Sequence, residues 1–204
     1  MGNGHHPGPT GATAASFPVD DGTLARISSP PPAAIGMKGG SAKGGSASLG
    51  DGIVGYARNR MGQVVGNGEC FTLVDRALRH AGARTAADFG EVTPDADYTW
   101  GTPVTLAELG PGDIIQFRDY VCDVHTETDS EVSDESQDRP HHTAIVERVG
   151  DHGLVTVLEQ NIPPGTGVSR NQLYFSAGTF SSGGGGTTRV RVRGTFWFFR
   201  AQAS

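Results

Sequence analysis

Cys70 stands where a thiol can act as a nucleophile. It follows the glycine-containing segment 63–69, and apolar residues from Phe71 to Ala81 recur at three- and four-residue steps. This spacing predicts a helix that begins at Cys70 and ends at Gly82. A cysteine attacks as its thiolate, and a helix N-terminus lowers a thiol pKa that is about 8.5 in a free cysteine. The alternative is that Cys70 is a small buried apolar residue, as many free cysteines are.

The start of this helix also offers groups that could stabilise an oxyanion. Its free backbone N–H groups, that of Cys70 included, can hold a developing negative charge. The side chain of Gln63 is a further candidate donor, and Gly68 would let a substrate backbone approach closely. The carboxylate of Glu69 disfavours a neighbouring thiolate unless it points away.

A general base for Cys70 is expected at His142. Residues 142–149 alternate as a strand does, and the small Ala144 follows His142 on the same face, which leaves room for the imidazole ring at a cleft. His141 would point to the other face and is the alternative base. A surface pair of histidines without catalytic function is the other interpretation.

The segment 154–161 is predicted to return beside this strand, joined to it by the turn 150–153. His142 and Asn161 lie equally far from the turn, so we expect them to pair almost directly, with Glu159 one step along on the same face. A base histidine needs a polar partner that fixes its tautomer and orientation. The sequence leaves open whether Glu159 or Asn161 has this role.

The second cysteine, Cys122, allows two other interpretations. With His125, His141 and His142 it could form a zinc cluster, but the spacing matches no established ligand pattern, so we expect no metal and no cofactor. A disulfide between Cys70 and Cys122 would block the nucleophile, and two cysteines do not make a disulfide framework.

The remaining elements complete an α+β fold. A helix is predicted over 53–61 and ends at Gly62, and strands are predicted over 113–118 and 188–200, the last with a bulge or bend at Gly194. Helices come first and antiparallel strands follow, which predicts N-terminal helices packed on an antiparallel β-sheet.

Composition divides the chain into an arm and one domain. Residues 1–50 are rich in Gly, Pro, Ala and Ser and are expected to be a disordered arm, whereas 51–204 form the domain. Within it, 119–140 is an acidic insertion whose part 129–137 we expect to be a mobile tip. The insertion could recruit a basic protein; calcium is a weaker alternative, because the EF-hand order of ligands is absent.

Charge and hydropathy exclude several classes of partner. The net charge is −6 and no basic stripe is present, so neither nucleic acid nor an anionic membrane is expected as a partner. No apolar run is long enough to span a membrane, and no secretory signal is visible, so the chain reads as soluble. We expect a monomer.

Four short motifs around the candidate residues resemble one enzyme group. They surround Cys70, the Gly112-Asp-Ile114 turn, His142 and Glu159-Gln-Asn161, and they are similar to the CHAP hydrolases, which are papain-like and related to the NlpC/P60 hydrolases. The family order of Cys, His, Glu and Asn corresponds here to Cys70, His142, Glu159 and Asn161. This resemblance implies a papain-like fold and hydrolysis of a peptide or peptidoglycan-like amide.

A narrower resemblance covers 51 to about 202. Its motifs, which include Trp100-Gly101, Pro140-His-His-Thr-Ala144 and Gly194-Thr-Phe-Trp197, are similar to the cysteine-proteinase-fold domain of fungal actin-patch, myosin-associated proteins. That group carries no reaction over to this chain. The sequence therefore predicts a cysteine amidohydrolase or peptidase, with a non-catalytic papain-fold binding module, recruiting its partner through the acidic insertion, as the alternative.

Overall fold

The computed structural model describes residues 48–182 and 185–204, so the predicted arm over 1–50 lies almost wholly outside the described residues. Two α-helices precede a seven-stranded antiparallel sheet, as the α+β prediction requires. The strands are β1 (Thr102–Val104), β2 (Ile114–Glu127), β3 (Val132–Val149), β4 (Leu154–Glu159), β5 (Ser169–Tyr174), β6 (Gly178–Ser182) and β7 (Gly186–Arg200). Three short 3₁₀ turns lie at Ala86–Asp88, Leu106–Glu108 and Asp151–Gly153.

Helix α1 (Leu49–Arg58) begins earlier and ends earlier than the sequence predicts. Ser48 is its N-cap: the hydroxyl accepts the Asp51 N–H, and the Asp51 carboxylate accepts the Ser48 N–H, which forms a capping box. Met61, which we expected inside the helix, lies beyond its end and is exposed. The capping box of Ser48 and Asp51 therefore determines where α1 begins, and the apolar spacing alone places this start too late.

Helix α2 (Cys70–Ala81) confirms the sequence prediction at both ends. Gly82 has a φ of 75°, in the left-handed region that ends a helix without strain only for glycine. Leu73, Val74, Ala77 and Leu78 are buried. The packed stripe holds the first turn of α2, and with it Cys70, against the sheet.

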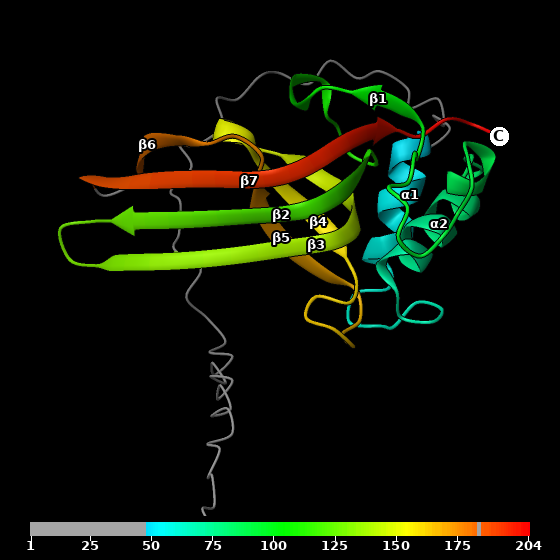
Figure 1. The fold of residues 1–204 in the computed structure, drawn as a ribbon, viewed down its shortest axis with the longest axis horizontal. Helices are drawn as coiled ribbons and strands as arrows, with labels where there is room; N and C mark the ends of the chain where they lie inside the picture. Colours follow the sequence, from blue (N-terminus) through cyan, green and yellow to red (C-terminus); the bar gives the residue numbers. More distant parts are fainter. Residues whose placement is uncertain (1–47, 183–184) are drawn as a thin grey trace, which may run out of the picture. The chain divides into compact units, whose positions relative to one another are not determined.

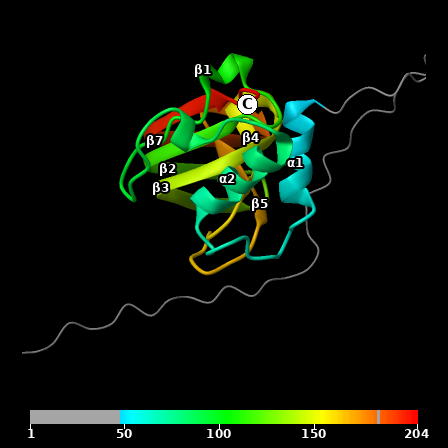
Figure 2. The ribbon, with the colours of Figure 1, turned by 90° about the vertical axis from the view of Figure 1, so that its right-hand side faces the viewer.

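The sheet has the order β1-β7-β2-β3-β4-β5, with β6 pairing the outer side of β7. Both helices lie at one end of the long strands β2, β3 and β7, while the turn that joins β2 to β3 lies at the other (Figure 1). Seen along these strands, α1 and α2 stand in front of the sheet (Figure 2). No described helix has the length and apolar content that crossing a bilayer requires.

Hydrophobic cores lie on both faces of the sheet. Ile114 belongs to the core shared with α1, α2 and Trp100, whereas Ile115 belongs to a second core that contains Phe117 and Phe175. Neighbouring residues of a strand point to opposite faces, so both members of such a pair can be buried only in a sheet that is covered on both sides. The parts of β3 and β4 that carry the candidate site therefore belong to a sheet that is packed on both faces.

The segment 129–137, predicted as a mobile tip, is a short turn followed by the first residues of β3. The β2–β3 ladder continues from the Tyr120–Arg139 pair to the Glu127–Val132 pair, so most of the acidic insertion is regular strand. Alternate residues Tyr120, Cys122 and Val124 pack on the second core. Most carboxylates of the insertion occupy exposed positions near the turn and on β3, and their number hides the two-residue apolar period of β2 in the sequence. We refer to residues 120–139 as the acidic ribbon.

A bulge lies where the acidic ribbon begins, and it confirms the bend predicted at Gly194. The β2–β7 register shifts between Arg118 and Val121. Gly194 has a φ of 89°, and a Cβ atom there would come within 2.1 Å of the Asp119 carbonyl oxygen. Glycine is therefore required at this position both by conformation and by space.

Candidate active site

Cys70 is the first residue of α2 and is partly buried. Its N-cap, Glu69, has extended backbone angles and makes no side-chain capping bond, so the helix start is open toward solvent. Gly66 precedes it with a φ of 63°, and a Cβ on Gly66 would come within 2.3 Å of Thr72 Cγ2. This tight turn brings the segment 63–69 onto the first turn of α2 and leaves the thiol accessible.

The ring of His142 lies beside the thiol of Cys70, and each group shifts the pKa of the other. Burial would raise the pKa of Cys70, but the neighbouring ring and charge of His142 lower it, and so does the backbone of Thr143 and Phe71. The net result is a pKa below the ordinary value of a thiol. The thiolate is the form that acts as a nucleophile.

His142 lies between the thiol and a buried carboxylate. Its Nε2 is 2.9 Å from Oε2 of Glu159, at an angle outside hydrogen-bond geometry, so the contact is a charge pair. Burial would lower the pKa of His142, whereas the neighbouring Cys70 and the contact with Glu159 raise it to about 9. The imidazolium is therefore the favoured form at neutral pH.

Glu159 is fully buried, and two further side chains donate hydrogen bonds to its carboxylate, one of them positively charged. Arg139, itself 2% exposed, donates from Nε to Oε2 at 2.9 Å and from Nη2 to Oε1. Asn171 Nδ2 donates to Oε1 at 2.7 Å. Burial would raise the pKa of Glu159, but His142 and Arg139 lower it to about 2. The carboxylate is thus ionised at any pH at which the protein would function.

Asn161 does not pair with His142, and that prediction is wrong. Strand β4 ends at Glu159 and the β3–β4 ladder stops at the Ile145–Leu158 pair. Asn161 has a φ of 72°; its Oδ1 accepts the Gly165 N–H at 2.6 Å, and its Nδ2 lies 3.4 Å from Glu69 Oε2. The chain leaves the sheet two residues before Asn161. Of the two candidate partners the structure places Glu159 against His142.

Gln160 positions the segment that carries Cys70, a role that the sequence interpretation missed. Its buried amide accepts the Val65 N–H at 2.6 Å and donates to the carbonyl oxygens of Val65 and Glu69 at 3.1 and 3.0 Å. These bonds tie the end of β4 to the chain just before α2. The only signal in the sequence is that Gln160 lies between two candidate residues.

A cavity of about 500 Å³ opens at Cys70. Its walls come from the start of α2 and the residues just before it, the loop 92–98 and the middle of β3: Asn67, Glu69, Cys70, Phe71, Thr72, Val92, Thr93, Pro94, Tyr98 and His141. The alternative base, His141, lines this cavity, but its Nε2 lies 2.9 Å from the carbonyl oxygen of Ala96 rather than against the thiol. The loop that shapes the cavity had no readable pattern.

Neither of the predicted oxyanion residues Gln63 and Gly68 lines this cavity. The carbonyl oxygen of Gln63 accepts the Val168 N–H at 2.9 Å, which directs this segment toward β5. Asn67 is in the wall instead. Its Oδ1 accepts from the Glu69 N–H at 3.1 Å and from the Thr72 hydroxyl at 2.5 Å, which fixes the orientation of the amide.

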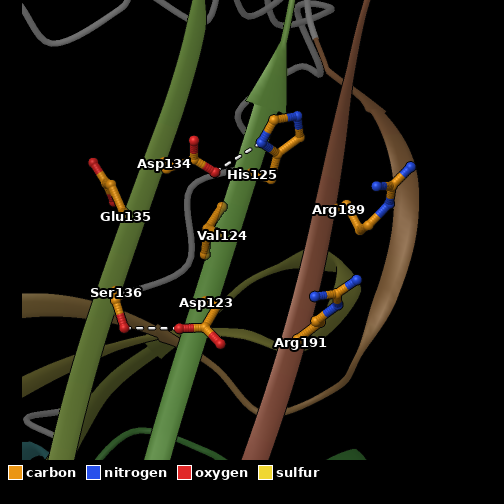
Figure 3. A pocket seen from close by; sticks show the side chains of 8 residues that line it. All are labelled: Asp123, Val124, His125, Asp134, Glu135, Ser136, Arg189 and Arg191. Atoms are coloured by element: carbon orange, nitrogen blue, oxygen red, sulfur yellow. Dashed lines mark hydrogen bonds and ion pairs between the residues drawn. The ribbon is translucent and has the colours of Figure 1, made fainter.

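The second cysteine is separate from this site. Both cysteines are free thiols, so the disulfide considered from the sequence does not form, and Cys122 is buried in the second core. His125, a member of the zinc set, lies on the acidic ribbon with Nδ1 2.8 Å from Asp134 Oδ1 (Figure 3). Across residues 48–182 and 185–204, no group of three or more His, Cys, Asp or Glu side chains is placed to hold a metal ion.

A family model matches residues 26–184, which is most of the chain. It describes the AIM3/BBC1 cysteine proteinase-fold domain. The chain belongs to this family. Membership in the AIM3/BBC1 family agrees with the narrower of the two resemblances and establishes a cysteine proteinase fold; the match begins within the segment predicted as an arm. Comparison with curated proteins gives no match, and comparison with solved structures gives none either.

Proposed function

We propose that this domain is a cysteine-dependent amidase or peptidase of the CHAP and NlpC/P60 type. The observation that carries the proposal is a thiol at a helix N-terminus, next to a histidine that is itself in contact with a buried carboxylate. Nucleophile, base and orienting group are thus Cys70, His142 and Glu159. A structural thiol requires none of these contacts.

The chemistry would proceed in two halves. The Cys70 thiolate attacks the amide carbonyl carbon, and the protonated His142 gives its proton to the leaving nitrogen as the C–N bond breaks, which leaves a thioester on Cys70. Water then attacks the thioester carbonyl while His142 takes its proton. The C–S bond breaks, the acid is released and the thiolate is restored. Glu159 stays ionised throughout, because its pKa is about 2.

Stabilisation of the oxyanion would come from the start of α2. The backbone N–H of Cys70 is one donor, as the sequence predicts. We assign the second to Nδ2 of Asn67, because its Oδ1 is already held by two donors and because Asn67 shares a cavity wall with Cys70. Asn161, the fourth residue of the CHAP order, then contributes through its contact with Glu69 rather than through the base.

Labelling with iodoacetamide tests the nucleophile. The wild-type protein should take up one equivalent at Cys70, at a rate that persists below the pH at which a free thiol reacts. Cys70→Ser should lose the label, His142→Ala should react more slowly, and Cys122→Ser is the matched control that should react as wild type does. Equal labelling at the buried Cys122, or no labelling, would contradict the proposal.

Turnover needs a separate measurement. An activated p-nitrophenyl ester should acylate Cys70 with a burst of p-nitrophenol, followed by steady release as water hydrolyses the thioester. Mass spectrometry should find the acyl group on Cys70 in the wild type and in no Cys70→Ser sample. A burst without steady release would show a reactive thiol that does not turn over.

A non-catalytic binding module is the second candidate, and the acidic ribbon favours it. Carboxylates line its exposed positions, and its strand pairs extend far from the helices (Figure 1). The basic partner suggested by the sequence would bind there. A fluorescent oligoarginine peptide should bind wild type more tightly than a variant with Glu127, Asp129 and Glu131 changed to their amides, and salt should weaken the binding. Equal affinity for both would exclude this function for the ribbon tip.

A further inference from the structure

The carboxylate of Glu69 is the one acidic group in the wall of the Cys70 cavity, and its position needs an explanation. An N-cap side chain commonly accepts an N–H of its own helix, but Glu69 makes no such bond. Its contact among the described residues is with Asn161 Nδ2 at 3.4 Å, a long hydrogen bond. The residue is exposed, so the charge faces the solvent-filled cavity rather than the protein.

The other walls of the cavity do not neutralise this charge. They contain no Lys or Arg, and they are apolar where Phe71, Val92 and Pro94 contribute. The cation on the neighbouring strand, Arg118, is already engaged: it pairs with Asp97 at 2.8 Å and donates to the Asp95 carbonyl oxygen at 2.7 Å. Among the residues that line the cavity, Glu69 therefore contributes a negative charge above apolar surface, and no lining Lys or Arg pairs with it.

We propose that the site selects a substrate with a positively charged nitrogen, an ammonium or guanidinium group, next to the amide that Cys70 attacks, and that Glu69 binds this group. The proposal rests on the proposed function, since it assigns a substrate class to the same nucleophile. A cation there would offset the repulsion between Glu69 and the Cys70 thiolate, because it is attracted to both. An acidic substrate would be repelled by both Glu69 and the Cys70 thiolate.

The selection can be measured without knowing the natural substrate. Three methanethiosulfonate reagents of similar size serve as probes: aminoethyl, which is cationic, methyl, which is neutral, and sulfonatoethyl, which is anionic. The Cys70 thiolate attacks the sulfenyl sulfur of each, a disulfide forms, and methanesulfinate leaves. The readout is the ratio of the cationic to the anionic rate constant. Dividing the rates cancels any change in the thiolate population.

Wild type should show a larger ratio than a free thiol such as N-acetylcysteine. A unit charge about 6 Å from the reacting group in water changes each rate by about threefold in opposite directions, so Glu69→Gln should lower the ratio by about tenfold. Glu69→Asp keeps the charge and should keep most of the ratio. Glu135→Gln removes an equal charge from the exposed face of the acidic ribbon and should change nothing.

The two failures are distinguishable. An unchanged ratio in Glu69→Gln, with the neutral reagent still labelling Cys70 rapidly, would overturn the cation selection and leave the nucleophile intact. If the neutral reagent reacts with Cys70 no faster than with the free thiol, the proposed function fails and the substrate class fails with it. A ratio that does not fall at high ionic strength would also count against Glu69, because exposed charges are screened by salt.

Discussion

The buried charges behind His142 allow one prediction to be worked out in numbers. Glu159→Gln removes the anion that lies between His142 and Arg139 and leaves a guanidinium that is 2% exposed without an ionic partner. Loss of one partner of a buried pair costs about 3–5 kcal/mol. The pKa of Glu159 gives a similar figure: a fall from 4.5 to about 2 corresponds to about 3 kcal/mol of preference for the ionised form in the folded protein.

Urea unfolding at pH 7 measures this loss directly. Glu159→Gln should lower the free energy of unfolding by about 3 kcal/mol, a large part of the total stability of an ordinary domain. The double variant Arg139→Met with Glu159→Gln removes both charges, so it should recover a substantial part of that loss. If the double variant is no more stable than Glu159→Gln alone, the unpaired guanidinium is not the cause and the reasoning fails.

The same variants separate the structural role of Glu159 from its role beside the base. Without the carboxylate, the pKa of His142 should fall, because one of the two groups that raise it is gone. The pH profile of Cys70 alkylation should then change in both Glu159→Gln and the double variant, whereas Arg139→Met alone should largely keep the wild-type profile. A stability effect without any change of profile would assign Glu159 to folding only.

Three further predictions concern pH, the Cys70 segment and the bulge. Stability should decrease as pH falls from 4.5 toward 2, where Glu159 is protonated, and as pH rises from 6.5 through 9, where His142 loses its proton; urea midpoints across pH measure both. Gln160→Leu removes three hydrogen bonds from the segment before α2 and should slow alkylation of Cys70, whereas the exposed Gln63→Leu should not. Gly194→Val should lower the melting temperature by several degrees, because a side chain there meets the Asp119 carbonyl; an unchanged melting curve would contradict the close approach.

The parts of the fold that the sequence predicted are those with local signals. Helix α2 has an apolar stripe and a terminal glycine, and the β3–β4 hairpin has a turn between two alternating segments, so each can be recognised within about fifteen residues. The acidic ribbon has an apolar alternation only in β2, at Tyr120, Cys122 and Val124, whereas the facing residues 133–139 of β3 include no apolar side chain and carboxylates dominate the composition. We interpreted charge as mobility where it marks the exposed face of a strand.

The site was predictable to the extent that its residues lie on those elements. Cys70, His142 and Glu159 follow from the helix start and the hairpin. Asn161 was misplaced because the end of β4 depends on a change to a positive φ that no local pattern announced. Arg139 and Gln160 act through contacts with residues 20 and 95 positions away in the chain, and spacing within one element cannot indicate such contacts.

The charged chain behind His142 ends at the base of the acidic ribbon. Arg139, which holds Glu159, also donates from Nη1 to the carbonyl oxygen of Asp138 at 2.7 Å. The β2–β3 hairpin therefore has two parts, which differ in how far their length can vary without moving His142. Changes of length near the turn leave the contacts between Arg139 and Glu159 untouched, whereas an insertion at 138 or 139 would shift the guanidinium and, with it, the imidazole. We therefore expect differences in the length of this hairpin to lie near the turn, and not at residues 138 and 139 beside the bulge.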